Sequence, residues 1–73
     1  MDNKRFYEEK AMYIIKALKH LDDVLESLED LVTIEGRNAV ESDEELYQTY
    51  VDDAVALKRT LEAELDGIHA LVG

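Results

Sequence analysis

The chain has 73 residues, of which 47% are apolar and 36% charged, and its formal net charge at pH 7 is −10. This length allows one small domain, and the acidic balance argues against a general nucleic-acid or anionic-membrane binder. Because there is no cysteine, disulfides, thiolate zinc sites and cysteine nucleophiles are excluded.

The composition also predicts a long-helix protein and its location. There is no proline, and the three glycines are few enough to favour uninterrupted helices. Residues 1–5 are not followed by a continuous apolar segment, so we expect no signal peptide. No run approaches the roughly eighteen apolar residues of a membrane span. We therefore expect a soluble, cytoplasmic protein without a membrane partner.

The first predicted helix runs from about residue 4 to residue 35. Asp2 or Asn3 is placed to cap its start, and Gly36 to end it in a left-handed conformation. Apolar residues recur at alternating spacings of three and four, which is typical of a packed helix. This seam comprises Ala11, Ile14, Leu18, Leu21, Leu25, Leu28 and Val32, and it is widened by Val24 and Leu31 on one side and by Ile15 on the other. The apolar arc covers about 200° of the helix.

A loop over residues 36–42 separates this helix from a second one, predicted from about residue 43 to residue 72. Ser42 and Glu45 have the spacing of a capping box, in which each side chain binds the backbone of the other. The second seam comprises Tyr47, Tyr50, Val51, Ala54, Leu57, Leu61, Leu65, Ile68 and Val72. Its arc covers roughly 160°.

These elements predict an all-α fold in which residues 1–73 form a single helical-hairpin domain. A connector this short makes the two helices antiparallel neighbours. A lone hairpin cannot cover apolar arcs of this width, and ordering the chain costs on the order of 1.5 kcal/mol per residue. We therefore expect two hairpins to dimerise into a four-helix bundle with a coiled-coil-like seam.

The charge is concentrated at one end of this hairpin. Residues 22–53, here called the acidic end, contain twelve acids and one base, for a net charge of −11, whereas the rest of the chain sums to +1. Acids in the last turns of the first helix oppose its dipole, so a role other than helix stability is indicated. The candidate partner-binding residues are Asp22, Asp23, Glu26, Glu29, Asp30 and Asp52. They either imitate a nucleic-acid phosphate backbone or only keep the protein in solution.

Residues that could carry chemistry are few. Asp66 and His69 share a helical face, and pairing of the helices would bring Glu8 and Glu9 near His69. Di-iron bundles use Glu-x-x-His, whereas this chain has Asp, placed at the edge of the apolar arc. No glycine-rich phosphate loop or Ser/His/Asp arrangement occurs. We expect no catalytic residues, no metal and no cofactor.

The sequence therefore predicts a non-enzymatic, acidic protein-interaction module. The favoured reading is a small regulator or inhibitor that docks its acidic end onto a basic, nucleic-acid-binding protein without contacting nucleic acid itself. The alternative is a structural dimerisation or adaptor bundle whose charge serves only solubility. A small metal-binding bundle of the ferritin-like kind is the third possibility.

Overall fold

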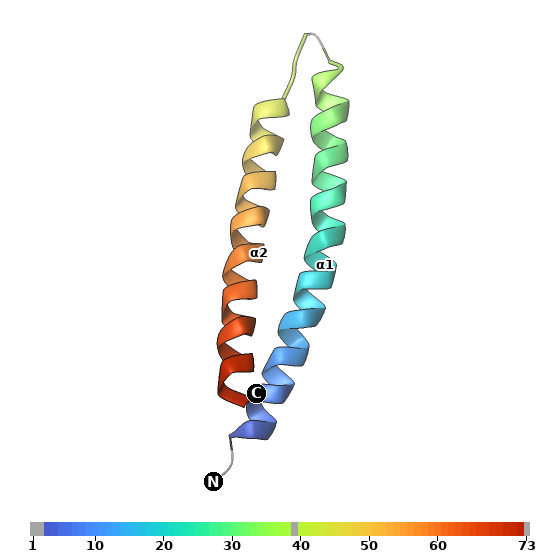
Figure 1. Ribbon diagram of the computed structural model, residues 1–73. Coiled ribbons are helices and arrows are strands. Elements are labelled where there is room, and N and C mark those ends of the chain that lie inside the picture. The colour runs from blue at the N-terminus through green and yellow to red at the C-terminus, as the bar shows by residue number, and fades with distance from the viewer. Residues whose placement is uncertain (1–2, 39, 73) are drawn as a thin grey trace.

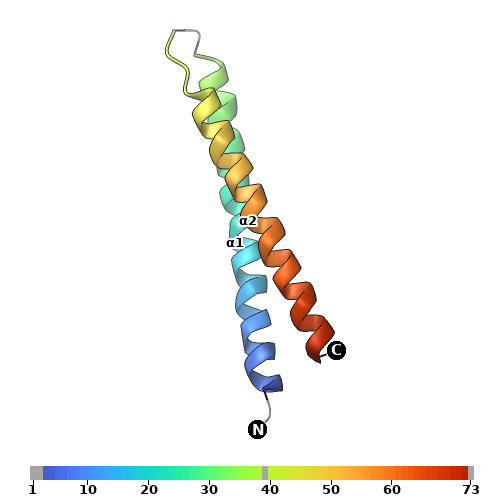
Figure 2. The same cartoon turned by 90° about the vertical axis from the view of Figure 1, so that its left-hand side faces the viewer.

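The computed structural model is an antiparallel hairpin of two long helices, α1 (Lys4–Gly36) and α2 (Glu44–Val72). The helices lie side by side along their length (Figure 1) and cross at a shallow angle (Figure 2). The structure describes residues 3–38 and 40–72, of which Val72 is described in its backbone alone. The predicted all-α hairpin is confirmed. No helix in these two ranges is long and apolar enough to cross a membrane.

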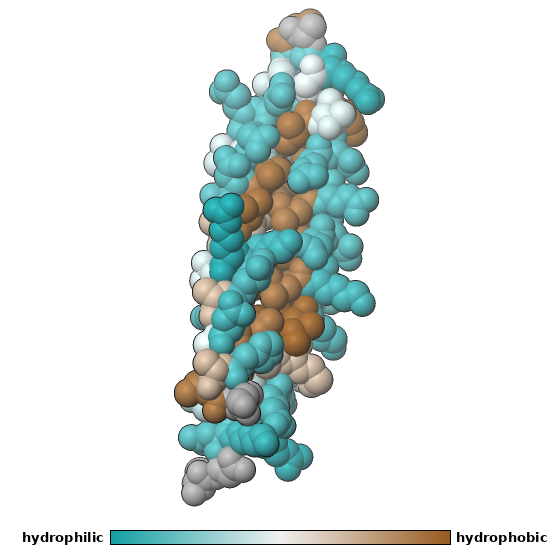
Figure 3. All heavy atoms as spheres, viewed as in Figure 1, coloured by the Kyte–Doolittle hydropathy of each residue, from teal (hydrophilic) through white to brown (hydrophobic). Residues whose placement is uncertain are grey.

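The core lies along the line between the helices and is thin. Its buried side chains are Ala11, Ile14, Val51, Ala54 and Ile68. The best-packed cluster lies near the termini, where Ala11, Ile14 and Ile68 are surrounded by half-buried Tyr7, Leu18, Leu61 and Leu65. Elsewhere a strip of hydrophobic atoms stays visible between rows of hydrophilic side chains (Figure 3). One hairpin therefore leaves its apolar seam partly open to water.

The end of α1 differs from the expected left-handed glycine. Gly36 belongs to the helix, and no glycine in the described ranges has a positive φ. Arg37 continues with φ −84° and ψ −12°, and its N–H donates to the Ile34 carbonyl at 3.1 Å. A Cβ on Gly36 would lie 3.3 Å from the Glu44 carboxylate. Gly36 therefore makes no left-handed turn, and its neighbour is the end of an exposed Glu44 side chain from the start of α2.

The start of α2 also differs from the predicted capping box. Ser42 Oγ donates to the Glu35 carbonyl at 2.9 Å and accepts the Glu44 N–H at 3.2 Å. Asp43 is the N-cap, since its carbonyl accepts the Tyr47 N–H at 3.0 Å. The carboxylate that binds the Asp43 N–H belongs to Glu35 of α1, at 3.0 Å. Ser42 reaches forward as predicted, but to Glu44 and not to Glu45, and the carboxylate that binds at this helix start is that of Glu35 in place of Glu45.

The two helix starts are unlike each other. Asn3 occupies the N-cap of α1 without a side-chain capping hydrogen bond, and Asp2 lies outside the described residues. The loop after α1 is held by Asn38, whose side-chain oxygen accepts the N–H groups of Val40 and Glu41 at 3.3 and 3.4 Å. The Asn38 amide also donates to the Glu41 carbonyl. The loop end is therefore tied together by side-chain hydrogen bonds to its backbone.

The hairpin is a rod and not a compact body. Its radius of gyration is 16.9 Å, against about 11 Å for a compact chain of this length. Its extents are 61 × 15 × 15 Å. The accessible surface is 5783 Å², whereas about 4,600 Å² is expected for a compact monomer of its mass. The chain therefore exposes roughly a quarter more surface than a self-contained domain.

Candidate functional site

The seam between the helices contains most of the predicted core residues. Ile14, Ala54 and Ile68 are buried. The half-buried members are Leu18, Leu21, Leu25, Leu28, Tyr47, Leu61 and Leu65. Leu57 is different, because 51% of it is exposed and it lies beside the seam of the single hairpin. The place expected for Leu57 between the helices is taken by Lys58, which is half-buried.

Lys58 is the seam residue that an apolar pattern does not reveal. Its Nζ lies 2.8 Å from Oδ1 of Asp22, and 37% of its side chain is exposed. The hydrogen bond to Asp22, and next the negative charge of Asp22, raise the pKa of Lys58 above its ordinary value of 10.5. Its spacing was the available signal: Lys58 lies four residues after Ala54 and three before Leu61, as a seam position should.

A second row of apolar side chains runs beside the seam. Ala17, Val24 and Leu31 recur every seven residues, each just before a seam residue of α1. On α2, Tyr50 and Leu57 follow the same rule. In an antiparallel pair, residues in this position on both helices flank the same side of the seam. This apolar face comprises Phe6, Tyr13, Ala17, Val24 and Leu31 of α1 with Leu46, Tyr50, Leu57 and Leu71 of α2, all of them exposed.

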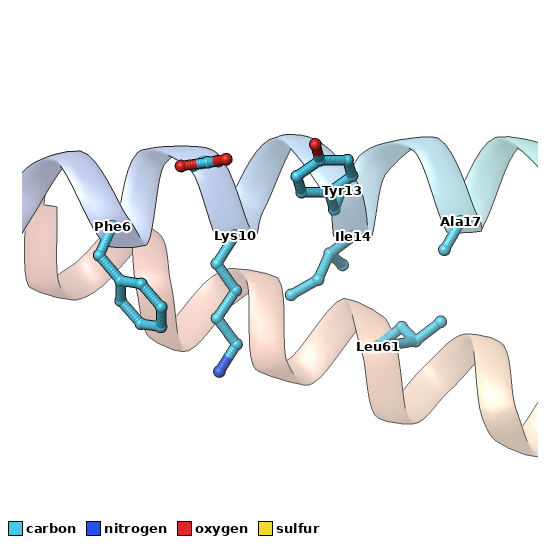
Figure 4. Close-up of a pocket in the computed structure, with 7 residues that line it drawn as sticks. Phe6, Lys10, Tyr13, Ile14, Ala17 and Leu61 are labelled. Carbon is cyan, nitrogen blue, oxygen red and sulfur yellow. The ribbon is translucent and has the colours of Figure 1, made fainter.

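A groove of about 450 Å³ opens on the apolar face toward the terminal end of the rod. Its walls are Phe6, Glu9, Lys10, Tyr13, Ile14 and Ala17 of α1 and Leu61 of α2. Figure 4 shows Phe6 and Lys10 extending from α1 toward α2, with Ile14 and Leu61 between the helices. The Phe6 ring meets Tyr7 edge-on, with centroids 5.3 Å apart. The groove is thus a preformed, mainly apolar hollow with one acid, Glu9, and one lysine, Lys10, at its wall.

The six candidate partner-binding acids are all exposed, and they lie between the middle of the rod and the loop. Five are on the second half of α1 and Asp52 is on the first half of α2. Asp52 accepts a hydrogen bond from Gln48 Nε2 at 3.3 Å. Among these six, and counting described cations only, Asp22 alone has a basic side chain within ion-pair distance.

The acids of α1 lie away from the apolar face. Val24 and Leu31 each come just before a seam residue, whereas Asp22 and Glu29 each come just after one. These two acids therefore flank the opposite side of the seam from the apolar face. Asp23, Glu26 and Asp30 fall further round the outer surface of α1. The structure therefore separates a charged surface from an apolar one.

The histidine and carboxylate candidates do not gather into a metal site. Asp66, His69, Glu8 and Glu9 are all exposed. Within residues 3–38 and 40–72 there is no group of three or more His, Asp or Glu side chains arranged to hold a metal ion. The metal-binding possibility therefore gains no support from the geometry.

Comparison with known proteins found no match to any family model, to any curated protein or to any solved structure.

Proposed function

We propose that the protein is a non-enzymatic protein-interaction module that acts as a homodimer, two hairpins packing into a four-helix bundle. The observation that carries this proposal is the apolar face. Phe6 is 60% exposed, Val24 48% and Leu57 51% in the single hairpin. A contiguous apolar face of this kind on a small protein is typical of an interface.

The surface area supports the same conclusion. The chain exposes about 1,200 Å² more than a compact monomer of its mass would. A standard interface removes about 800 Å² from each partner. The excess surface is larger than the area that a standard interface takes from each partner, and the apolar face includes residues of both helices, which supports packing against a second hairpin.

Sedimentation equilibrium tests the dimer directly. We expect a species of about twice the chain mass of 8.4 kDa at micromolar concentration. The paired substitutions Val24→Glu and Leu57→Glu should shift this equilibrium toward monomer, because they place unpaired charges on the interface. Met12→Glu is the control, since Met12 is exposed outside the apolar face. A wild-type chain that stays folded as a monomer would contradict the proposal.

The second part of the proposal concerns the acidic end, which we assign to docking on a basic protein surface of the kind that binds nucleic acid. It is favoured by the exposure of the six acids and by the lack of a described cation beside five of them. Because these acids lie away from the apolar face, dimerisation leaves them accessible. Attraction between exposed charges is screened over about 8–10 Å, so such binding should weaken steeply with salt.

A charge-reversal pair separates local docking from net charge. The probe is a peptide of about 20 residues rich in lysine and arginine, at physiological salt, where a site presenting several carboxylates should give salt-dependent binding. The test variant carries Asp23→Lys, Glu26→Lys and Asp30→Lys. The control carries Glu8→Lys, Glu62→Lys and Asp66→Lys, with the same net charge change far from the loop. We expect at least about a tenfold loss of affinity for the first and little for the second. Equal losses would leave the acids as a solubility device and favour the adaptor alternative.

A further inference from the structure

We infer that the two hairpins of the dimer lie with their loops at opposite ends, so that the groove of each copy is covered by the loop-end half of the other copy's apolar face. This inference rests on the proposed dimer and specifies its partner surface. Two symmetric packings of the apolar faces are available. One has a two-fold axis along the rod and puts both loops at one end, and the other has an axis across the rod and puts them at opposite ends.

The charge distribution distinguishes these two packings. With both loops together, two acidic ends of net charge −11 each would lie side by side in rods only 15 Å wide. At physiological salt charges this far apart are largely screened, but at about 0.01 M salt, where the Debye length is about 30 Å, the repulsion between the two ends acts in full. With the loops apart, each acidic end lies beside the terminal half of the other copy. That half, residues 1–21 and 54–73, has a net charge of +1, so it does not repel the acidic end.

The shape of the apolar face gives the same answer. With both loops together, groove would face groove, and the hollow of about 450 Å³ on each copy would stay unfilled at a cost in stability. With the loops apart and the rods fully overlapped, the groove at residues 6–17 meets the other copy at about the level of its residue 30. Leu31 and Tyr50 of the second copy then lie over the groove.

Two details of the structure suit this contact. Tyr50 meets Tyr47 edge-on with centroids 5.8 Å apart, which holds its ring on the apolar face. Lys10, at the wall of the groove, would lie beside the acidic end of the second copy.

The absence of cysteine makes the orientation measurable, because a single introduced cysteine carries one spin label per chain. We choose Val40→Cys at the loop, where Val40 is 89% exposed. The control is His20→Cys near the middle of α1, where the two labels come close in either packing. With loops apart, pulsed electron–electron distance measurements should place the Val40 labels at about the rod length of 61 Å. The His20 labels should lie within about 30 Å, on the scale of two packed helix diameters and the label arms.

The possible results test the orientation of the two hairpins and the existence of the dimer separately. A dimeric mass with Val40 labels closer than about 30 Å, the scale of two packed helices, overturns the orientation and leaves the dimer standing. A monomeric mass with no distance between His20 labels overturns the dimer itself. A dimeric mass with long Val40 and short His20 distances supports the inference.

Discussion

Lys58 Nζ and Asp22 Oδ1 lie 2.8 Å apart, and this ion pair joins a lysine on the seam of α2 to a carboxylate on the flank of α1. The aliphatic stem of Lys58 covers the seam while its ammonium reaches the surface, which lets a charged residue occupy an otherwise apolar row. A slip of one helical turn would move the ammonium by about 5.4 Å and break the bond. The pair therefore marks the register of the hairpin near its middle.

The first prediction is a stability contribution from this pair that disappears in strong base. Because Asp22 raises the pKa of Lys58 in the folded chain, the pair stabilises the fold below the ordinary lysine pKa and loses its effect as the pH rises through the raised value. We expect the melting temperature of wild type to exceed that of Asp22→Asn at pH 9. The difference should shrink steadily as the pH is raised above 10.5, the ordinary pKa of lysine. A difference that stays constant over this range would contradict the assignment.

The second prediction concerns the seam of α1. Leu25 is half-buried between the helices, so Leu25→Ala should lower the free energy of unfolding by about 2–3 kcal/mol, toward the low end for core truncations. Leu25→Asp should unfold the chain, because it places an unpaired charge in the seam. Met12→Ala is the control, since Met12 is exposed outside the seam and surface changes cost within about 0.5 kcal/mol. Urea denaturation measures all three, and equal losses at both sites would argue against this seam.

The bounds of the helices could be predicted from the sequence, because helical periodicity depends only on the spacing of residues that are close together in the chain. Both helices begin and end within one residue of the predicted bounds, apart from the terminal details of capping. The caps were not predictable in the same way. The acceptor for the Asp43 N–H comes from Glu35, eight residues earlier and on the other helix, so no local motif announces it. Local spacing predicts elements, whereas contacts across the loop depend on how the helices dock.

The site is predictable in part for the same reason. A pattern built on apolar residues alone selected Leu57 and passed over Lys58, although the seam spacing favours Lys58. The width of the apolar arcs did predict surplus apolar surface, and the structure shows that most of it lies beside the seam on one side of the hairpin, with Met12 and Ile15 exposed elsewhere on α1. The groove was not predictable, because it depends on how the side chains of α1 and Leu61 leave a hollow between the helices.

The third prediction tests the role of Glu35 in the loop. Glu35→Ala removes the acceptor for the Asp43 N–H, and the loss of a helix-start hydrogen bond costs about 1 kcal/mol. Amide hydrogen exchange should quicken in the first turn of α2 and remain unchanged near Ala54. Glu41→Ala is the control, because the Glu41 side chain makes no hydrogen bond within the described ranges. If both variants exchange alike, Glu35 does not hold the start of α2.

The last prediction concerns the stability cost of the acidic end. Its acids lie close together on one half of the rod, and their mutual repulsion acts through solvent, where salt screens it over about 8–10 Å. We expect the melting temperature of the wild-type chain to rise as sodium chloride increases from 10 to 200 mM, measured by circular dichroism at constant chain concentration. The variant Asp23→Lys, Glu26→Lys and Asp30→Lys should lose most of this rise. The variant Glu8→Lys, Glu62→Lys and Asp66→Lys should keep it, although both variants change the net charge from −10 to −4.

If the rise follows net charge alone, the two variants will respond equally to salt. If the wild-type melting temperature falls with salt, attractive ion pairs outweigh the repulsion, and the Lys58–Asp22 pair is the first to examine by Asp22→Asn.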